Sequence, residues 1–258
     1  MTALVRIHAI AANTVREAIR SKVLYVLLFF ALLLIGTGVL LSTLSYVERE
    51  RILQDVGLAS IRLFGAAIAI FVGVGLIHKE VDRRTIFTIL SKPVSRTEFL
   101  LGKFAGLVVT LWLQVAIMGA GFVLVSWMAG APITWEHAQA IVLVGAELAL
   151  LVAVATLFSS FTTPMLASLF GAGIYLVGHL TRNLRDLGAA SGDPAAAQVT
   201  ALIHRVMPDL EAFNVSIEAV HGLPIPAAAV WQPLAYGACY AAVLLLFAAV
   251  IFERRDFR

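Results

Sequence analysis

The chain has 258 residues, of which 60% are hydrophobic and only 14% are charged, and its mean hydropathy is +0.93. A soluble domain carries about 25% charged residues, so this composition excludes an ordinary soluble protein and predicts an all-α membrane protein. The net charge is +3, but no basic stretch alternates with stacking aromatic residues, which argues against nucleic acid as a partner. Cys239 is the only cysteine, which excludes an intramolecular disulfide and a thiolate metal cluster.

Residues 2–20 predict an amphipathic helix that precedes the first membrane span. Its apolar residues recur at helical spacing, whereas Arg6, Asn13, Arg16, Glu17 and Arg20 gather on the other side. Such a helix lies in the membrane interface, with lipid as its partner. The alternative is a plain extension of the first span. The apolar stripe consists of Leu4, Val5, Ile7, Ala11, Thr14, Val15, Ala18 and Ile19.

Six apolar segments are long enough, or nearly so, for transmembrane helices, which need about 20 residues each. The first is too long for a signal-peptide core, so we expect it to be retained. The second carries Arg62 near one end, where we expect the side chain to reach the headgroups. Because no segment outside the spans is large enough for a soluble domain, we expect residues 1–258 to form a single transmembrane domain. The predicted spans are 23–41, 58–77, 104–128, 138–158, 164–181 and 234–252.

Lysine and arginine predict the orientation of these spans, because they concentrate on the cytoplasmic side. An even number of spans places both termini on one side. With both termini in the cytoplasm, 13 of the 19 lysines and arginines are cytoplasmic and 6 are outside. The sequence therefore predicts cytoplasmic termini.

The loop from His78 to Lys103 predicts a short helix, a stop and a capped restart. Glu80 and Arg84 have the spacing of a helical ion pair, and Pro93 ends the helix. Ser95 and Glu98 form a capping box before the third span. The apolar ridge of this short helix has no partner within so small a loop, so it is a candidate docking surface for another protein. The ridge consists of Ile86, Phe87, Ile89 and Leu90.

Glu147 is an acidic residue deep in a predicted span, where burial costs several kcal/mol unless the carboxyl group is paired or protonated. Two interpretations remain open: a polar group that lines a translocation path, and a protonated helix contact. Gln114 of the third span is a candidate partner. The segment 182–230 predicts short outer helices between spans five and six, and a surface for a periplasmic partner.

The motifs of common catalytic sites are missing from the sequence. It contains no G-x-x-x-x-G-K-[ST], no H-E-x-x-H and no G-x-S-x-G, so neither ATP hydrolysis by a phosphate-binding loop nor these hydrolase chemistries are expected. The six histidines are scattered, and we expect no metal site and no cofactor. The chain is not expected to be an enzyme.

The stretch from Arg84 to Lys103 resembles the type-2 family of ABC transporter permeases. Supporting similarity lies in Ser159–Phe161, Pro208–Asn214 and Phe252–Phe257. Within the family, the chain looks closest to the permeases of nitrous-oxide-reductase maturation and of gliding motility. The resemblance implies six spans, an interfacial N-terminal helix, a cytoplasmic coupling helix and outer helices between spans five and six. It also implies two copies of a separate ABC ATPase, and a second permease copy.

On this resemblance, we expect a permease of an ATP-driven exporter in a bacterial inner membrane. The residues expected to contact the ATPase are Glu80, Arg83, Arg84, Thr85, Ile86, Phe87, Ile89 and Leu90. Two alternatives remain: a membrane scaffold or assembly factor without transport, and an intramembrane enzyme, for which no residue set is recognisable. The sequence leaves open the substrate, the direction of transport and whether the two permeases are identical.

Overall fold

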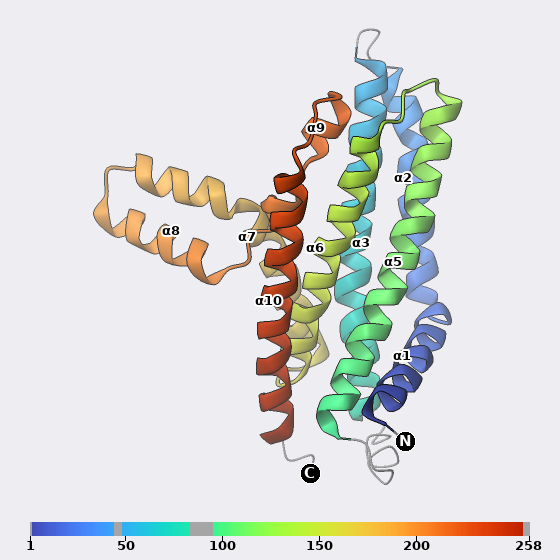
Figure 1. The fold of residues 1–258 in the computed structure, drawn as a ribbon. Coiled ribbons are helices and arrows are strands. Elements are labelled where there is room, and N and C mark those ends of the chain that lie inside the picture. Colours follow the sequence, from blue (N-terminus) through green and yellow to red (C-terminus); the bar gives the residue numbers. More distant parts are fainter. Residues whose placement is uncertain (1, 44–47, 83–94, 255–258) are drawn as a thin grey trace.

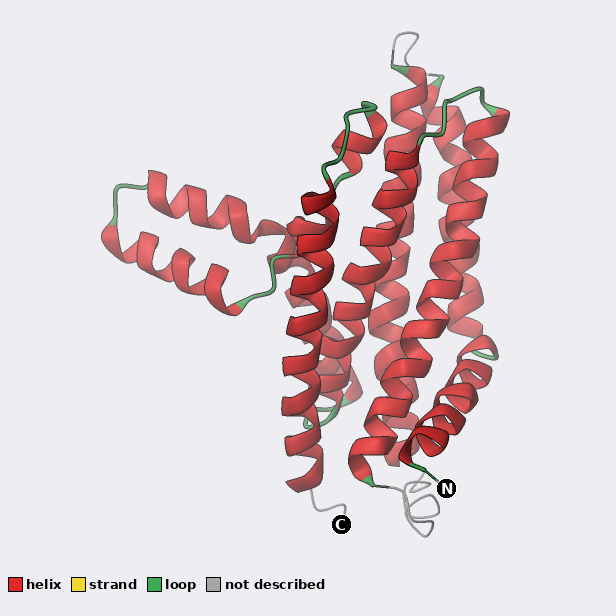
Figure 2. Cartoon of the chain, in the orientation of Figure 1, coloured by secondary structure: helices red, strands yellow, loops and turns green. Residues whose placement is uncertain are grey.

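The computed structural model describes residues 2–43, 48–82 and 95–254, without the side chains of 77–82 and 254. Within these ranges the chain is helical and contains no strand (Figure 2). The elements are α1 (Ala3–Ile19), α2 (Lys22–Ser42), α3 (Arg49–Asp82), α5 (Arg96–Met128), α6 (Trp135–Ser159), α7 (Pro164–Ala190), α8 (Pro194–Val206), the 3₁₀ helix η1 (Leu210–Phe213), α9 (Ser216–Val220) and α10 (Ala227–Arg254).

In the described residues, six helices are long and apolar enough to cross a membrane: α2, α3, α5, α6, α7 and α10. The predicted all-α membrane fold is thereby confirmed. Several helices extend past the predicted apolar segments. Thus α3 begins at Arg49 rather than at residue 58, and α7 continues to Ala190 rather than to residue 181. Polar residues end an apolar run but are compatible with a helix, so the pattern underestimates helix length.

Helices α3 and α6 form the centre of the bundle, and α2, α5, α7 and α10 surround them (Figure 1). Their most apolar stretches are 61% and 67% buried, against 22% for α2 and 17% for α10. A helix with apolar residues on every side fits such a central position. Gly65 of α3 permits this packing, since a Cβ atom there would lie 2.4 Å from a methyl group of Leu148 on α6.

Helix α1 packs obliquely along α5 (Figure 1). Two glycines of α5 make the close approach possible, because a Cβ atom at Gly102 or Gly106 would overlap Ile10 or Ala11 of α1. Helix α1 ends at Ile19, and Ser21 is the N-cap of α2 in an extended conformation. The N-terminal amphipathic helix is therefore a separate element, and the alternative of a continuous extension of the first span is wrong.

Short helices lie between the fifth and sixth spans, as predicted. The C-terminal part of α7 and the following α8 form a hairpin that projects sideways from the bundle (Figures 1 and 2). Helix α8 packs mainly against α7. The chain then returns through η1 and α9, and η1 is held against the bundle by the buried Leu210 and Phe213.

The start of α1 and the end of α10 lie at the same end of the bundle (Figure 1). We call this the terminal end. The end of α3 and the start of α5 lie there too (Figure 1). The opposite end carries α9 and the connection between α5 and α6 (Figure 1).

Candidate functional site

Three ionisable residues from three spans meet inside the bundle. Glu147 of α6 has a fully buried side chain. Its Oε2 lies 3.4 Å from Nε of Arg62 on α3, and its Oε1 lies 3.4 Å from Nε2 of His179 on α7. The Arg62 side chain is 13% exposed and the His179 side chain 19%. We call these three residues the buried polar cluster.

The cluster lies between three of the helices that are long and apolar enough to cross a membrane. Glu147 comes twelve residues after the start of α6 at Trp135, and Arg62 comes thirteen after the start of α3 at Arg49. At 1.5 Å per residue, each lies roughly 18–20 Å from that end of its helix. Ionisable groups buried inside a bundle are costly unless paired, so the cluster holds α3, α6 and α7 in one relative arrangement.

The expectation that Arg62 reaches the headgroups is wrong. Its side chain is directed into the bundle and contacts Glu147. The predicted span began at residue 58, which would have placed Arg62 one turn from the membrane surface. Because α3 begins at Arg49, the residue is more than three turns inside the helix, and its side chain is only 13% exposed.

Gln114 of α5 is buried, but it forms no hydrogen bond with Glu147. Sequence reasoning missed His179 as the partner, since a fifth span ending at residue 181 placed this histidine at a membrane surface. The helix continues to Ala190, so His179 is not at its end, and its side chain contacts Glu147. Counting residues from the ends of each helix would have placed Arg62, Glu147 and His179 at a similar level in the bundle.

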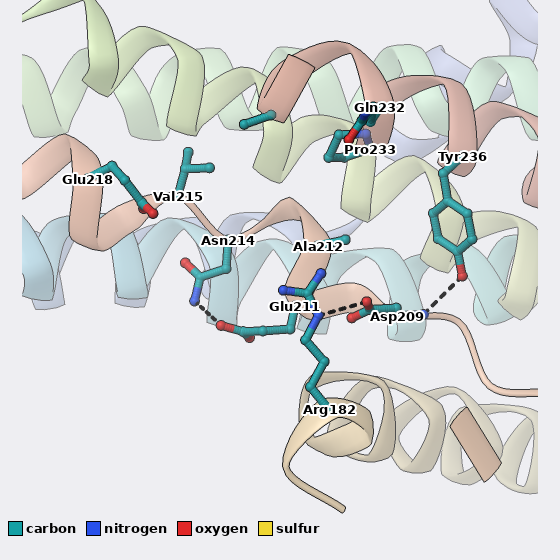
Figure 3. A pocket seen from close by; sticks show the side chains of 11 residues that line it. Arg182, Asp209, Glu211, Ala212, Asn214, Val215, Glu218, Gln232, Pro233 and Tyr236 are labelled. Atoms are coloured by element: carbon teal, nitrogen blue, oxygen red, sulfur yellow. Dashed lines mark hydrogen bonds and ion pairs between the residues drawn. The ribbon is translucent and has the colours of Figure 1, made fainter. Parts of the chain in front are cut away.

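A cavity of about 380 Å³ lies between α7, the η1–α9 segment and the start of α10 (Figure 3). Arg182 donates to Asp209 at 2.9 Å, and Asn214 donates to Glu211 at 2.7 Å. The backbone N–H of Asp209 donates to the Tyr236 hydroxyl at 3.0 Å. Glu211 is close enough to act electrostatically on the cluster. The cavity is lined by Arg182, Asp209, Glu211, Ala212, Asn214, Val215, Glu218, Ala229, Gln232, Pro233 and Tyr236.

The first turn of α5 is joined to both the first and the last helix of the chain. Arg6 of α1 donates through Nε to Glu98 at 2.9 Å. Arg96 donates to the carbonyl oxygens of Phe252 and Glu253 on α10, at 3.1 and 3.0 Å. One turn further, Lys103 Nζ lies 3.3 Å from the Glu17 carboxylate of α1. We call this set of contacts the α5 joint.

The predicted capping box at the start of α5 is present. The Ser95 hydroxyl accepts from the N–H of Glu98 at 3.1 Å, and the Glu98 carboxylate accepts from the N–H of Ser95 at 3.0 Å. Glu98 thus serves the helix cap and the contact to Arg6 at once. The cap fixes the helix start directly after residues 83–94.

We expect Ser95→Ala to lower the free energy of unfolding by about 1 kcal/mol, because one N–H of the first turn loses its acceptor. The matched control is Thr163→Ala at the N-cap of α7, where the side chain makes no capping hydrogen bond. Denaturant unfolding of both purified variants measures the difference. Equal stability of the two variants would contradict the assigned cap.

The predicted ATPase-contacting residues Arg83, Arg84, Thr85, Ile86, Phe87, Ile89 and Leu90 lie outside the described residues. Glu80 is in the last turn of α3, and its side chain is also outside them. These assignments stay predictions. Among the described residues, no three His, Cys, Asp or Glu side chains are grouped so that they could hold a metal ion.

Comparison with known proteins places the chain in a family. Residues 8–257 match the family described as ABC-2 family transporter protein. No curated protein matches the chain. The family match covers almost the whole sequence. The six apolar helices of the described residues agree with a membrane component of a transporter. The protein belongs to the ABC-2 family of transporter proteins and is a transmembrane subunit of an ABC transporter.

Proposed function

We propose that this subunit is the permease of an ATP-driven exporter, bound to two copies of a separate ABC ATPase through residues 80–90. A second permease copy completes the complex. The termini face the cytoplasm of a bacterial cell, and the complex lies in the inner membrane. ATP binding moves the ATPases, and the contact segment passes this motion to the spans, which alternate between two arrangements.

The α5 joint is the observation that supports this proposal most. Helix α5 begins at Arg96, shortly after residues 80–90 in the sequence, and its first turn is bonded to α1 and to α10. A displacement of the contact segment therefore moves three helices together rather than α5 alone. Rigid hydrogen-bonded connections of this kind carry a motion from a docking site into a bundle.

The charge distribution supports cytoplasmic termini more strongly once the position of Arg62 is known. Arg62 belongs to the buried polar cluster and no longer counts among the outer charges. Of the 19 lysines and arginines, 13 then fall in the segments assigned to the cytoplasm and 5 in the segments assigned to the outside. Such a bias is typical of a cytoplasmic terminal end.

Phe87→Asp tests the proposed contact with the ATPase. We expect the variant to reach the membrane in normal amounts but to lose the ATPase on purification of the tagged chain from its own host, because a charge replaces an apolar contact. The ATPase is recognised by its Walker sequence in mass spectrometry and by ATP hydrolysis of the purified complex.

Phe161→Asp is the matched control. Phe161 is an aromatic residue, 47% exposed, in the connection between α6 and α7. We expect this variant to keep the ATPase. Unchanged co-purification with Phe87→Asp would contradict the role of the contact segment. A complex whose ATP hydrolysis responds to no transported compound would instead favour a scaffold without transport.

A further inference from the structure

The hydrogen bond of His179 fixes which of its ring nitrogens carries a proton. Nδ1 lies 3.0 Å from the carbonyl oxygen of Tyr175, one helical turn earlier in α7. A carbonyl oxygen can only accept a hydrogen bond, so Nδ1 must be the donor. A neutral imidazole has a single N–H. If His179 is neutral, its Nε2 therefore presents a lone pair.

That second nitrogen faces a carboxylate oxygen. His179 Nε2 lies 3.4 Å from Oε1 of Glu147. Both carboxylate oxygens of Glu147 are buried, and neither accepts a hydrogen bond from the described residues. A neutral imidazole beside an ionised carboxylate would bring two lone pairs together in a region of low dielectric constant, and this arrangement is unfavourable. A single additional proton converts the contact into an attractive one.

We infer that one proton is bound between His179 Nε2 and Glu147 Oε1, inside the membrane-spanning part of the bundle. The proton resides on the imidazole, giving an imidazolium beside a carboxylate, or on the carboxyl group, which then donates to the imidazole. Both forms carry the same total charge. The site is built from two helices, and its ligand is the proton itself.

The surrounding charges are consistent with an additional positive charge at this contact. Arg62 of α3 approaches the pair from one side. Glu211 of η1 and Asp209, which directly precedes η1, act electrostatically on the pair. Asp209 is already paired with Arg182 of α7. Tyr175 of α7 is a further titratable side chain near the pair. Arg62 and the proton then balance the charges of Glu147 and Glu211, which lowers the cost of burial.

The proton connects α6 to α7, so its binding depends on how these helices are arranged. In water, glutamate and histidine titrate with pKa values of about 4.3 and 6.5, and at neutral pH an exposed pair would hold little of this proton. A movement that separates Glu147 from His179 and admits water therefore releases it, and closure binds it again. This consequence follows from the fold and does not require the proposed ATPase contact.

Nuclear magnetic resonance of the imidazole nitrogens, together with infrared spectroscopy of carboxyl groups, tests the inference on the full chain in lipid nanodiscs at pH 8. Gly178–His179 is the only Gly–His pair in the sequence. Carbonyl-labelled glycine combined with nitrogen-labelled histidine therefore assigns His179 without a substitution. A free histidine is roughly 3% protonated at this pH.

We expect one of two signatures at near-complete occupancy. Either both ring nitrogens of His179 are protonated, or Nδ1 alone is protonated and a carboxylic acid band disappears in Glu147→Gln. His221 is the matched control within the chain, because its Nδ1 makes the same bond to a carbonyl one turn earlier, Ile217, at 2.9 Å, but the residue is exposed.

The inference is overturned if His179 is neutral at pH 8 and no carboxylic acid band is present in the unmodified chain. It is also overturned if the His179 proton resides on Nε2 alone, since the bond to Tyr175 would then be misassigned. Both results come from the unsubstituted protein, so they do not depend on the folding of a variant. Neither result bears on co-purification of the ATPase.

Discussion

Replacing Glu147 by leucine is expected to lower the free energy of unfolding by about 3–5 kcal/mol, because Arg62 would remain buried without its counter-ion. The side chain of Arg62 is 13% exposed and contacts the Glu147 carboxylate. Loss of the carboxylate also removes the contact of α6 with His179 on α7. Unfolding of the purified chain in mixed detergent, followed by circular dichroism, measures the loss.

The double variant Arg62→Leu/Glu147→Leu separates the cost of an unpaired charge from the cost of lost packing. We expect it to be more stable than Glu147→Leu alone, since apolar residues replace a buried pair at little net cost. Glu48→Leu is the control, because Glu48 pairs with Arg51 where both side chains are more than 40% exposed. Such exposed pairs contribute about 0–1 kcal/mol. The ion pair would be contradicted if the double variant lost as much unfolding free energy as Arg62→Leu and Glu147→Leu lose together.

Gly106→Ala is expected to lower the free energy of unfolding by about 1–3 kcal/mol, through overpacking between α1 and α5. A Cβ atom at Gly106 would lie 2.6 Å from the backbone oxygen of Ala11 and 2.6 Å from Cβ of Thr14. Backbone atoms cannot rotate away, so α1 must shift as a whole. We expect faster tryptic cleavage after Arg16, because α1 opens more often.

The same substitution at Gly36 of α2 provides the control, since no atom lies within 4 Å of a Cβ placed there. Alanine is favoured over glycine inside a helix by roughly 0.5–1 kcal/mol. Gly36→Ala is therefore expected to be neutral or stabilising. If Gly106→Ala is as stable as Gly36→Ala, the close packing of α1 against Gly106 of α5 is contradicted.

The helices were predictable because their signals are local. A run of apolar residues marks each span, and Ser95 with Glu98 marks the start of α5 within a single turn. The separate N-terminal helix also followed from its own periodicity. Such signals depend on residues that are neighbours in the sequence, so they persist whatever the tertiary arrangement.

The buried polar cluster was only half predictable. Glu147 was identified because an acidic residue in an apolar segment requires a partner. Its actual partners depend on how α3, α6 and α7 are rotated and how far each extends, and the sequence pattern defines neither. Gln114 was a reasonable candidate because it lies near the middle of its predicted span. It belongs to α5, however, which contributes no residue to the cluster, and it forms no hydrogen bond with Glu147.

Because the chain enters α1 and leaves α10 at the same end of the bundle (Figure 1), two copies can be encoded as one tandem polypeptide. A flexible linker would join the end of the first copy to the start of the second without an added membrane crossing. Such a fusion can carry a substitution in one half and the unmodified residue in the other. It would show whether a complex with a single altered half keeps half of its activity or loses all of it.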